Sequence, residues 1–165
     1  MDKVVAPSPL MRQADRGPEL EITFSHPLNP ASEVHFTPLG DHTGLKRLGI
    51  HLVRVPPGKE SYVYHRHFGE EEFIYILSGR GLAEIDDQEY EVGPGDFMGF
   101  PTPSVGHHMK NPFSEELVYL SGGERRDMEI ADFPRHALRM LRAGMKISIT
   151  PTTGDVSFPG FEELK

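Results

Sequence analysis

Histidine and glutamate side chains are concentrated in one short stretch whose spacing is that of a metal site. His65 and His67 are separated by one residue, and Glu72 follows just before an apolar run, Phe73 to Leu77. In a β-strand residues i and i+2 point to the same face, so the two imidazoles would be aimed at one point. The β-branched and aromatic neighbours favour strand over helix. Imidazole together with carboxylate suits a borderline divalent ion: iron, manganese, nickel or zinc.

A second stretch offers a third imidazole. After a glycine- and proline-rich turn the chain reads His107-His108, followed by Asn111. Adjacent residues of a strand point to opposite faces, so only one of these two histidines can share a face with the first pair. The residues alone leave open which of the two is the ligand.

In this order the two stretches resemble the two motifs of the cupin superfamily. The first motif, G-x(5)-H-x-H-x(3,4)-E-x(6)-G, is matched by His65, His67 and Glu72, and the second, G-x(5)-P-x-G-x(2)-H-x(3)-N, by His107 and Asn111. The resemblance covers roughly residues 45 to 122. It implies a jelly-roll β-barrel in which three histidines and one glutamate bind a single divalent metal ion.

The match departs from the motifs at two places. Six residues rather than five lie between Gly58 and His65, and Pro103 stands where the second motif has glycine, with one extra residue before His107. Both changes fall in expected turns and leave the spacings between the ligands intact.

The neighbours of the matched residues have weaker claims to the metal. By strand alternation Glu71 and His108 point away from it, unless a β-bulge shifts the register by one residue. Asn111 is expected on the same face as His107, where it would position that imidazole through a hydrogen bond.

The composition is that of a folded polypeptide with many turns. The chain has 165 residues, 37% of them hydrophobic and 25% charged, with seventeen glycines and fifteen prolines, which favours an all-β fold in one domain. The absence of cysteine excludes disulfides and thiolate ligands. A net charge of −8 argues against nucleic-acid partners and anionic membranes. No apolar signal core or membrane-span pattern is present in this sequence, and a cytoplasmic location is expected.

Three regions are expected along the chain. Residues 1–44 would form an extended arm packing on the barrel, residues 45–122 the cupin-type barrel, and residues 123–165 a C-terminal extension. Residues 124–132 are interpreted as surface loop, residues 134–141 as a short helix and residues 146–149 as an edge strand. The other strands are predicted at 20–24, 45–55, 61–67, 72–77, 81–86, 88–92, 97–100 and 117–120.

The other histidines are interpreted without a metal role. His26, His35 and His42 read as solvated loop residues. His51 reads as a hydrogen-bonded histidine rather than a residue that lines the pocket, and Arg54 as part of a surface ion pair.

Three functions are compatible with this pattern. The resemblance implies a metal-dependent enzyme, a dioxygenase or an isomerase acting on sugars or sugar phosphates among the main options, with lyases and decarboxylases also possible. Small cupins with a similar LGIHLVRVPPG lead-in carry the provisional name sugar-phosphate isomerase. The alternative is a non-catalytic, metal-dependent binding or sensor protein. A storage barrel is disfavoured because it gains nothing from four intact ligands.

The pattern also sets expectations about substrate and partners. Three neutral imidazoles and one carboxylate would leave a divalent ion with a net charge of +1, which suits an anionic small molecule. The cations nearest the site in the sequence are Arg54, Arg66, Arg80 and Lys110, of which Arg66 and Lys110 should face away. No residue beyond the ligands is assigned a catalytic role. A homodimer is expected, formed through outward aromatic residues: Tyr62, Phe73 and Tyr75.

Overall fold

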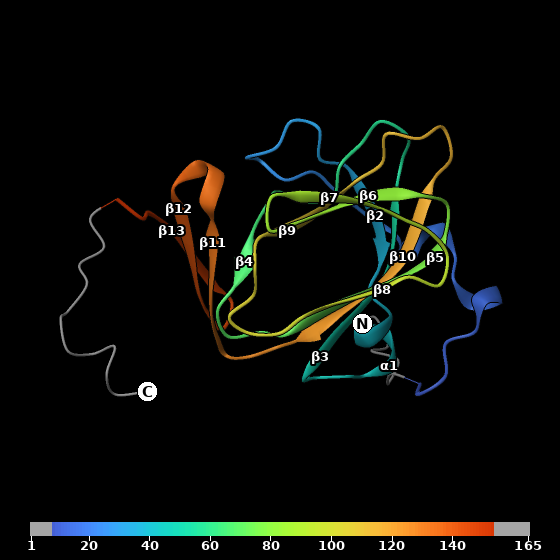
Figure 1. Ribbon diagram of the computed structural model, residues 1–165. Coiled ribbons are helices and arrows are strands. Elements are labelled where there is room, and N and C mark those ends of the chain that lie inside the picture. Colours follow the sequence, from blue (N-terminus) through green and yellow to red (C-terminus); the bar gives the residue numbers. More distant parts are fainter. Residues whose placement is uncertain (1–7, 154–165) are drawn as a thin grey trace.

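The larger of the two layers is an antiparallel sheet of six strands. The computed structural model describes residues 8–153, and its strands follow the alternation of apolar side chains along the chain. The strand order is β1-β2-β3-β10-β5-β8 (Figure 1). The strands are β1 (Ile22–Phe24), β2 (Val34–Thr37), β3 (Leu48–Val55), β10 (Leu117–Glu124), β5 (Glu72–Ser78) and β8 (Phe97–Phe100).

The opposite layer consists of two smaller sheets that meet at the metal-site residues. One has the order β7-β6-β9 and the other β13-β12-β11-β4, and a bridge between His65 and His107 connects them. In Figure 1 β11, β12 and β13 stand beside the barrel, next to β4. The strands are β4 (Arg66–His67), β6 (Gly81–Ile85), β7 (Gln88–Val92), β9 (His107–Lys110), β11 (Met128–Phe133), β12 (Leu138–Ala143) and β13 (Lys146–Pro151).

The hydrophobic core lies between these layers. Alternate residues of β3 and β5, such as Val53, Val55, Ile74 and Ile76, are buried, and Tyr119 of β10 joins them. This arrangement confirms the expected jelly-roll β-barrel. Burial of one face per strand fixes the register, because a slip of one residue would turn every apolar side chain outward.

Two turns between the barrel strands depend on residue type. A Cβ at Gly79, whose φ is +74°, would lie 2.1 Å from the carbonyl oxygen of Glu116, so only glycine fits there. Asp86 and Asp87 both have positive φ and form the two-residue connection between β6 and β7, as expected for a hairpin of the primed type.

The region before the barrel is more ordered than a plain arm. β1 and β2 continue the six-stranded sheet, although residues 26–44 were expected to run extended over the surface. The helix α1 (Leu39–Thr43) ends at Gly44, which adopts a left-handed conformation. The 3-10 turns Gln13–Asp15 and Pro18–Leu20 precede β1. Residues 1–7 of the expected arm and 154–165 of the extension lie outside the described residues.

The C-terminal region differs from the sequence expectation. Pro134–His136 form a single 3-10 turn and Leu138–Ala143 are β12, so the expected helix through residue 141 is wrong. The expected loop at 124–132 is also wrong, since its second half belongs to β11. The edge strand at 146–149 is confirmed as part of β13. Within the described chain, no helix is long and apolar enough to cross a membrane.

The expected strand at 61–67 is interrupted. Only Arg66 and His67 form β4, and the preceding residues touch β9 at separate points, Ser61 opposite Met109 and His65 opposite His107. Ser61 and His65 are four positions apart, whereas their partners Met109 and His107 are two positions apart, so the three residues Tyr62–Tyr64 bulge out of the ladder. His65 and His67 still face the same side.

Candidate metal centre

Four donor side chains from three parts of the barrel converge on one point. One ligand atom from each of His65, His67, Glu72 and His107 lies within 4.8 Å of the others. His65 and His67 come from the β4 segment, Glu72 begins β5 and His107 begins β9. The structure thus brings together all four residues that the sequence suggested, and it places His107 rather than His108 in the group.

Backbone carbonyls fix the orientation of two of the imidazoles. Nδ1 of His65 lies 2.7 Å from the carbonyl oxygen of Val63, and Nδ1 of His107 lies 3.1 Å from that of Val105. A carbonyl oxygen only accepts hydrogen bonds, so each Nδ1 carries a proton and donates it. In a neutral imidazole the other nitrogen, Nε2, then presents a lone pair.

The third imidazole is oriented by a buried carboxylate that the sequence interpretation missed. Nδ1 of His67 lies 3.2 Å from Oε1 of Glu129, whose side chain is only 1% exposed. Glu129 lies in β11, within the segment expected to be surface loop. The alternation Met128-Glu129-Ile130-Ala131 was the available signal for a strand, but it gave no indication that its polar face is the buried one.

This arrangement leaves hydrogen-bond acceptors facing one another at the centre. Nε2 of His107 and Nε2 of His67 lie 3.3 and 3.4 Å from the same carboxylate oxygen of Glu72. Lone pairs opposed in this way repel unless a positive charge, a proton or a metal ion, lies between them. Three imidazole nitrogens and one carboxylate are ligands that fit a borderline divalent ion.

The charge states of the group are set by burial and by its own members. Burial, together with the positive charges of neighbouring imidazoles, lowers the pKa of His65 to about 3, so this ring is neutral. Burial alone would raise the pKa of Glu72, but its contacts with His107 and His67 outweigh that effect and lower it. The group therefore presents one negative charge, a neutral His65, and a His67 whose pKa is raised, despite its burial, by the contacts with Glu72 and Glu129.

An aromatic ring supports the centre from inside the barrel. The ring of Phe100 stacks on that of His107 with 3.8 Å between centroids and 9° between planes. His107 is 2% exposed, whereas the side chains of His67 and Glu72 are 17% and 23% exposed. Solvent therefore reaches the centre on the side of His67 and Glu72.

The neighbouring residues of both motifs have other partners. His108 lies between Glu60 and Glu84, and Glu71 donates its backbone N–H to Glu124, so neither belongs to the group. Asn111 donates to the carbonyl oxygens of Val55 and Glu115. These hydrogen bonds stabilise the turn after β9. Asn111 does not hydrogen-bond to His107, so the expectation that it positions this imidazole is wrong.

The remaining histidines lie outside the group. His35 contacts the hydroxyl of Thr23, and His26 packs edge-on against Phe133. His51 is in phase with the buried residues Val53 and Val55, so its ring faces the barrel interior and contacts Phe36. No side chain among residues 8–153 hydrogen-bonds to that ring, so the expectation of a hydrogen-bonded histidine is wrong, and His51 packs against Phe36 instead.

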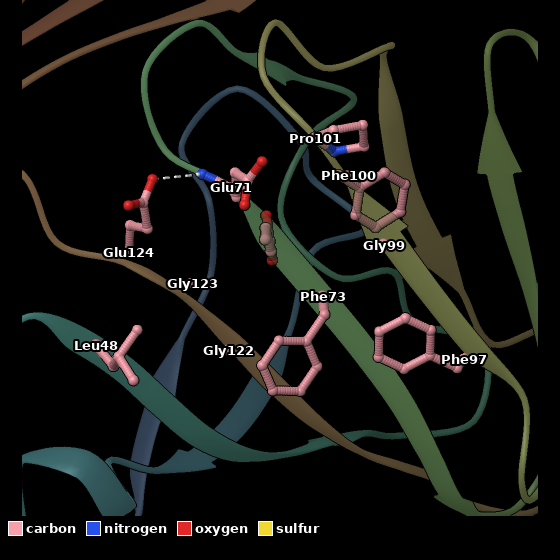
Figure 2. Close-up of a pocket in the computed structure, with 11 residues that line it drawn as sticks. Leu48, Glu71, Phe73, Phe97, Gly99, Phe100, Pro101, Gly122, Gly123 and Glu124 are labelled. Carbon is pink, nitrogen blue, oxygen red and sulfur yellow. Dashed lines mark hydrogen bonds between the residues drawn. The ribbon is translucent and has the colours of Figure 1, made fainter.

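A groove of about 410 Å³ lies on the outer face of the six-stranded sheet (Figure 2). Phe73 and Phe97 form its apolar wall, their rings stacked 5.9 Å apart, and Glu71 and Glu124 flank one end. Of the four donor residues only Glu72 borders the groove. The groove therefore adjoins the metal centre at Glu72 and at Phe100, whose ring stacks on His107, while the three imidazoles do not line it.

Comparison with known proteins agrees with this geometry. A family model described as Cupin domain matches residues 51–122. An uncharacterized protein of Methanocaldococcus jannaschii is 40% identical over 57 residues, which are 34% of this chain and 44% of that protein.

Two solved structures align with most of the chain. One, from Acidithiobacillus ferrooxidans, carries the provisional name sugar phosphate isomerase. It is 34% identical, with a TM-score of 0.86, over 92% of this chain and 97% of that one. The other, from Silicibacter pomeroyi, is named sugar phosphate isomerase from a cupin superfamily. It is 26% identical, with a TM-score of 0.74, over 85% of this chain and 90% of that one. With its motifs, barrel and converging donors, the chain belongs to the cupin superfamily.

Proposed function

We propose that this protein is a metal-dependent enzyme that isomerises a small phosphorylated sugar. In this proposal His65, His67, Glu72 and His107 hold one divalent ion, which is iron, manganese, nickel or zinc. The observation that carries it is the set of opposed acceptors around Glu72, with imidazole nitrogens 3.3 and 3.4 Å from one carboxylate oxygen. The names of the two aligned relatives support the substrate class.

The chemistry of such a reaction divides between the ion and the chain. When bound, a divalent ion supplies a Lewis acid for a carbonyl oxygen. Isomerisation by proton transfer also moves a proton between neighbouring atoms of the substrate, which requires an unprotonated side chain able to accept it. His51 faces the interior, and burial together with the charge of Arg125 lowers its pKa, so its imidazole is neutral at pH 7.

The phosphate end of the substrate needs a cation. The four cations suggested by the sequence are engaged with carboxylates: Arg54 with Glu21 and Glu116, Arg66 with Asp132, Arg80 with Glu91, and Lys110 with Glu84 and Glu89. Arg125 is placed differently. Its Nε lies 3.1 Å from where a Cβ of Gly49 would be, on the interior face of β3, and Asp41 holds its guanidinium by an ion pair. In this proposal Arg125 contacts the anionic end of the substrate.

The test is turnover by the metal-loaded protein. Aldose and ketose phosphates are incubated with it in D₂O, and interconversion and deuterium incorporation are followed by NMR. The proposal requires interconversion of at least one pair. His67→Ala is the control for metal dependence, and His51→Asn should reduce turnover while the metal content stays the same.

The same samples distinguish the other functions. Oxygen consumption with catechols, diketones or thiols in the iron-loaded protein would contradict isomerase function and indicate a dioxygenase. Saturable binding of a sugar phosphate without any conversion would indicate a non-catalytic binding or sensor protein.

A further inference from the structure

Glu129 connects the C-terminal sheet to the metal centre. Glu129 lies on β11. Two other residues of this strand, Ala131 and Asp132, pair with His67 and Arg66 of β4. Asp132 also holds the two strands together, because it forms ion pairs with Arg66 of β4 at 2.9 Å and with Arg139 of β12 at 2.7 Å. The strand that carries a candidate ligand is thus held from outside the barrel by the C-terminal extension.

One carboxylate oxygen of Glu129 accepts hydrogen bonds from three donors. Oε1 lies 3.2 Å from Nδ1 of His67, 3.2 Å from the backbone nitrogen of Phe68 and 3.4 Å from that of Gly69. A Cβ at Gly69 would be 2.5 Å from Oε2, so a residue without a side chain leaves the space that the carboxylate occupies. This geometry fixes both the ring of His67 and the turn that follows it.

From these contacts we infer that Glu129 is a positioning residue for the metal centre, acting through His67. A carboxylate that accepts the Nδ1 proton directs Nε2 toward the ion and makes that nitrogen a stronger donor. Carbonyl oxygens do the same for His65 and His107, but they carry no full negative charge. His67 is therefore the imidazole whose donor strength depends most on its partner.

A second metal ion beside Glu129 is the competing interpretation. Ligand atoms of His67, Glu70 and Glu129 also lie within 4.8 Å of one another. However, Oε1 of Glu70 already accepts the backbone N–H of Arg126 at 2.6 Å and pairs with the guanidinium of Arg142. Those donors engage Glu70, and the guanidinium of Arg142 already supplies a positive charge there. The three donors on Glu129 share Oε1, whereas its Oε2 is buried without a hydrogen-bond partner among the described residues and is the oxygen of Glu129 left for a second ion.

The inference rests on the metal centre of the proposed function but not on its substrate. The test is a competition titration of Co²⁺ or Zn²⁺ against a chelator, with the wild-type protein, Glu129→Gln and Glu124→Gln. Glutamine keeps the size of the side chain and an acceptor for Nδ1 but removes the charge. Glu124 is a matched control, because it accepts a backbone N–H beside Glu72 and contacts no histidine.

The expected result is a loss of metal affinity of about 10–100-fold in Glu129→Gln. The d–d absorption of bound Co²⁺ should also change, while the melting temperature of the metal-free protein stays close to that of the wild type. Glu124→Gln should bind like the wild type. Equal affinity of Glu129→Gln and the wild type would overturn the inference.

Two further measurements keep the inference testable if the variant does not fold. In the zinc-bound wild-type protein, NMR of the imidazole nitrogens should show the His67 proton on Nδ1, and a proton on Nε2 would refute the role. Binding of two ions per chain would replace it with a second metal site. A wild type that binds no metal would refute both the centre and the role of Glu129, whereas metal binding without isomerase activity would refute only the proposed function.

Discussion

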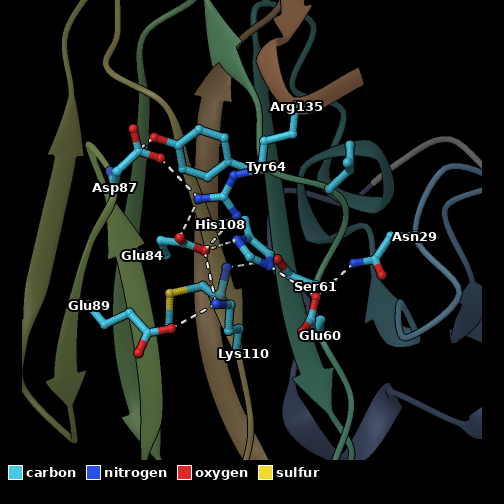
Figure 3. A network of polar contacts seen from close by, with 12 residues as sticks. Asn29, Glu60, Ser61, Tyr64, Glu84, Asp87, Glu89, His108, Lys110 and Arg135 are labelled. Carbon is cyan, nitrogen blue, oxygen red and sulfur yellow. Dashed lines mark hydrogen bonds and ion pairs between the residues drawn. The ribbon is translucent and has the colours of Figure 1, made fainter. Parts of the chain in front are cut away.

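His107 and His108 are consecutive residues of β9, yet they belong to two different polar clusters. His107 faces the barrel interior and turns Nε2 toward Glu72, with Nδ1 bound to a backbone carbonyl. His108 faces the other side, between Glu60 at 3.2 Å from Nε2 and Glu84 at 3.2 Å from Nδ1 (Figure 3). Both rings are buried and both have carboxylate neighbours.

The difference lies in convergence and in the charges already present. Around His107, three imidazoles and one carboxylate point to a common centre. Around His108, the carboxylates approach opposite ends of one ring, and the amide of Asn29 donates to Glu60 at 2.9 Å. Cations engage Glu84: Lys110 lies 3.0 Å from it, and Arg135 contacts it and covers the ring of Tyr64 (Figure 3). Among the described residues no lysine or arginine pairs with Glu72, whereas the second cluster already contains two cations.

Residue types alone therefore do not distinguish a metal centre from a structural ion-pair network. Donor atoms must face one point, and their charge must be uncompensated, before a metal ion is the best partner. The two clusters allow this distinction to be tested within one strand.

The largest effect is expected from His107→Gln. It removes a ligand and should reduce metal affinity by more than the about 10–100-fold typical of residues that only support a ligand. Elemental analysis and a chelator titration measure the loss. His108→Gln is the matched change one residue away and should leave metal binding intact. If both variants lost the metal equally, the distinction between the clusters would be wrong.

A change in the other cluster should affect stability and not the metal. Glu84→Gln removes the carboxylate that Lys110 and Arg135 share and leaves them only Glu89 and Asp87. It should lower the free energy of unfolding by about 1.5–3 kcal/mol, the usual contribution of a hydrogen bond to a charged group. Urea denaturation of the metal-free protein measures this. A change in metal content instead would show that the clusters are coupled.

The same carboxylate should make stability depend on pH. The hydrogen bond from Arg135 is the main cause that lowers the pKa of Glu84 from 4.5 to about 2. Because the pKa is lower in the folded state, this contribution is complete above pH 4.5 and is lost as the pH falls toward 2. Acid unfolding of Glu84→Gln should depend less on pH across this window than that of the wild type, and parallel curves would contradict the assignment.

The smallest effect is expected from Phe100→Leu. It removes the ring stacked on His107 but no ligand. Aromatic pairs contribute about 0.5–1.5 kcal/mol, so metal affinity should fall by less than about tenfold. Calorimetric titration of the metal-free protein measures it. A loss as large as that of His107→Gln would mean that packing, rather than ligation, holds the site together.

The sequence by itself determined the fold class and three of the four converging donors. Strand periodicity and fixed spacing relate His65, His67 and Glu72 locally. The resemblance to the second motif pointed to His107, and the structure separated it from His108. Glycine at position 79 and aspartate at 86 and 87 are residue types that indicate turns, because they tolerate the positive φ that these positions adopt. Such local rules need no knowledge of distant contacts.

Only the tertiary structure decided what supports the site. In β11 polar side chains face the interior and apolar ones face solvent. Glu129 and Asp132 are buried, while Met128 and Ile130 are 74% and 39% exposed. One oxygen of Glu129, Oε1, is satisfied in the interior by His67 and the amides that follow it, and His67 lies 62 residues earlier in the chain. A buried charge is stable only where its partners are brought to it, and that pairing follows from the packing of β11 on β4 and not from any local pattern.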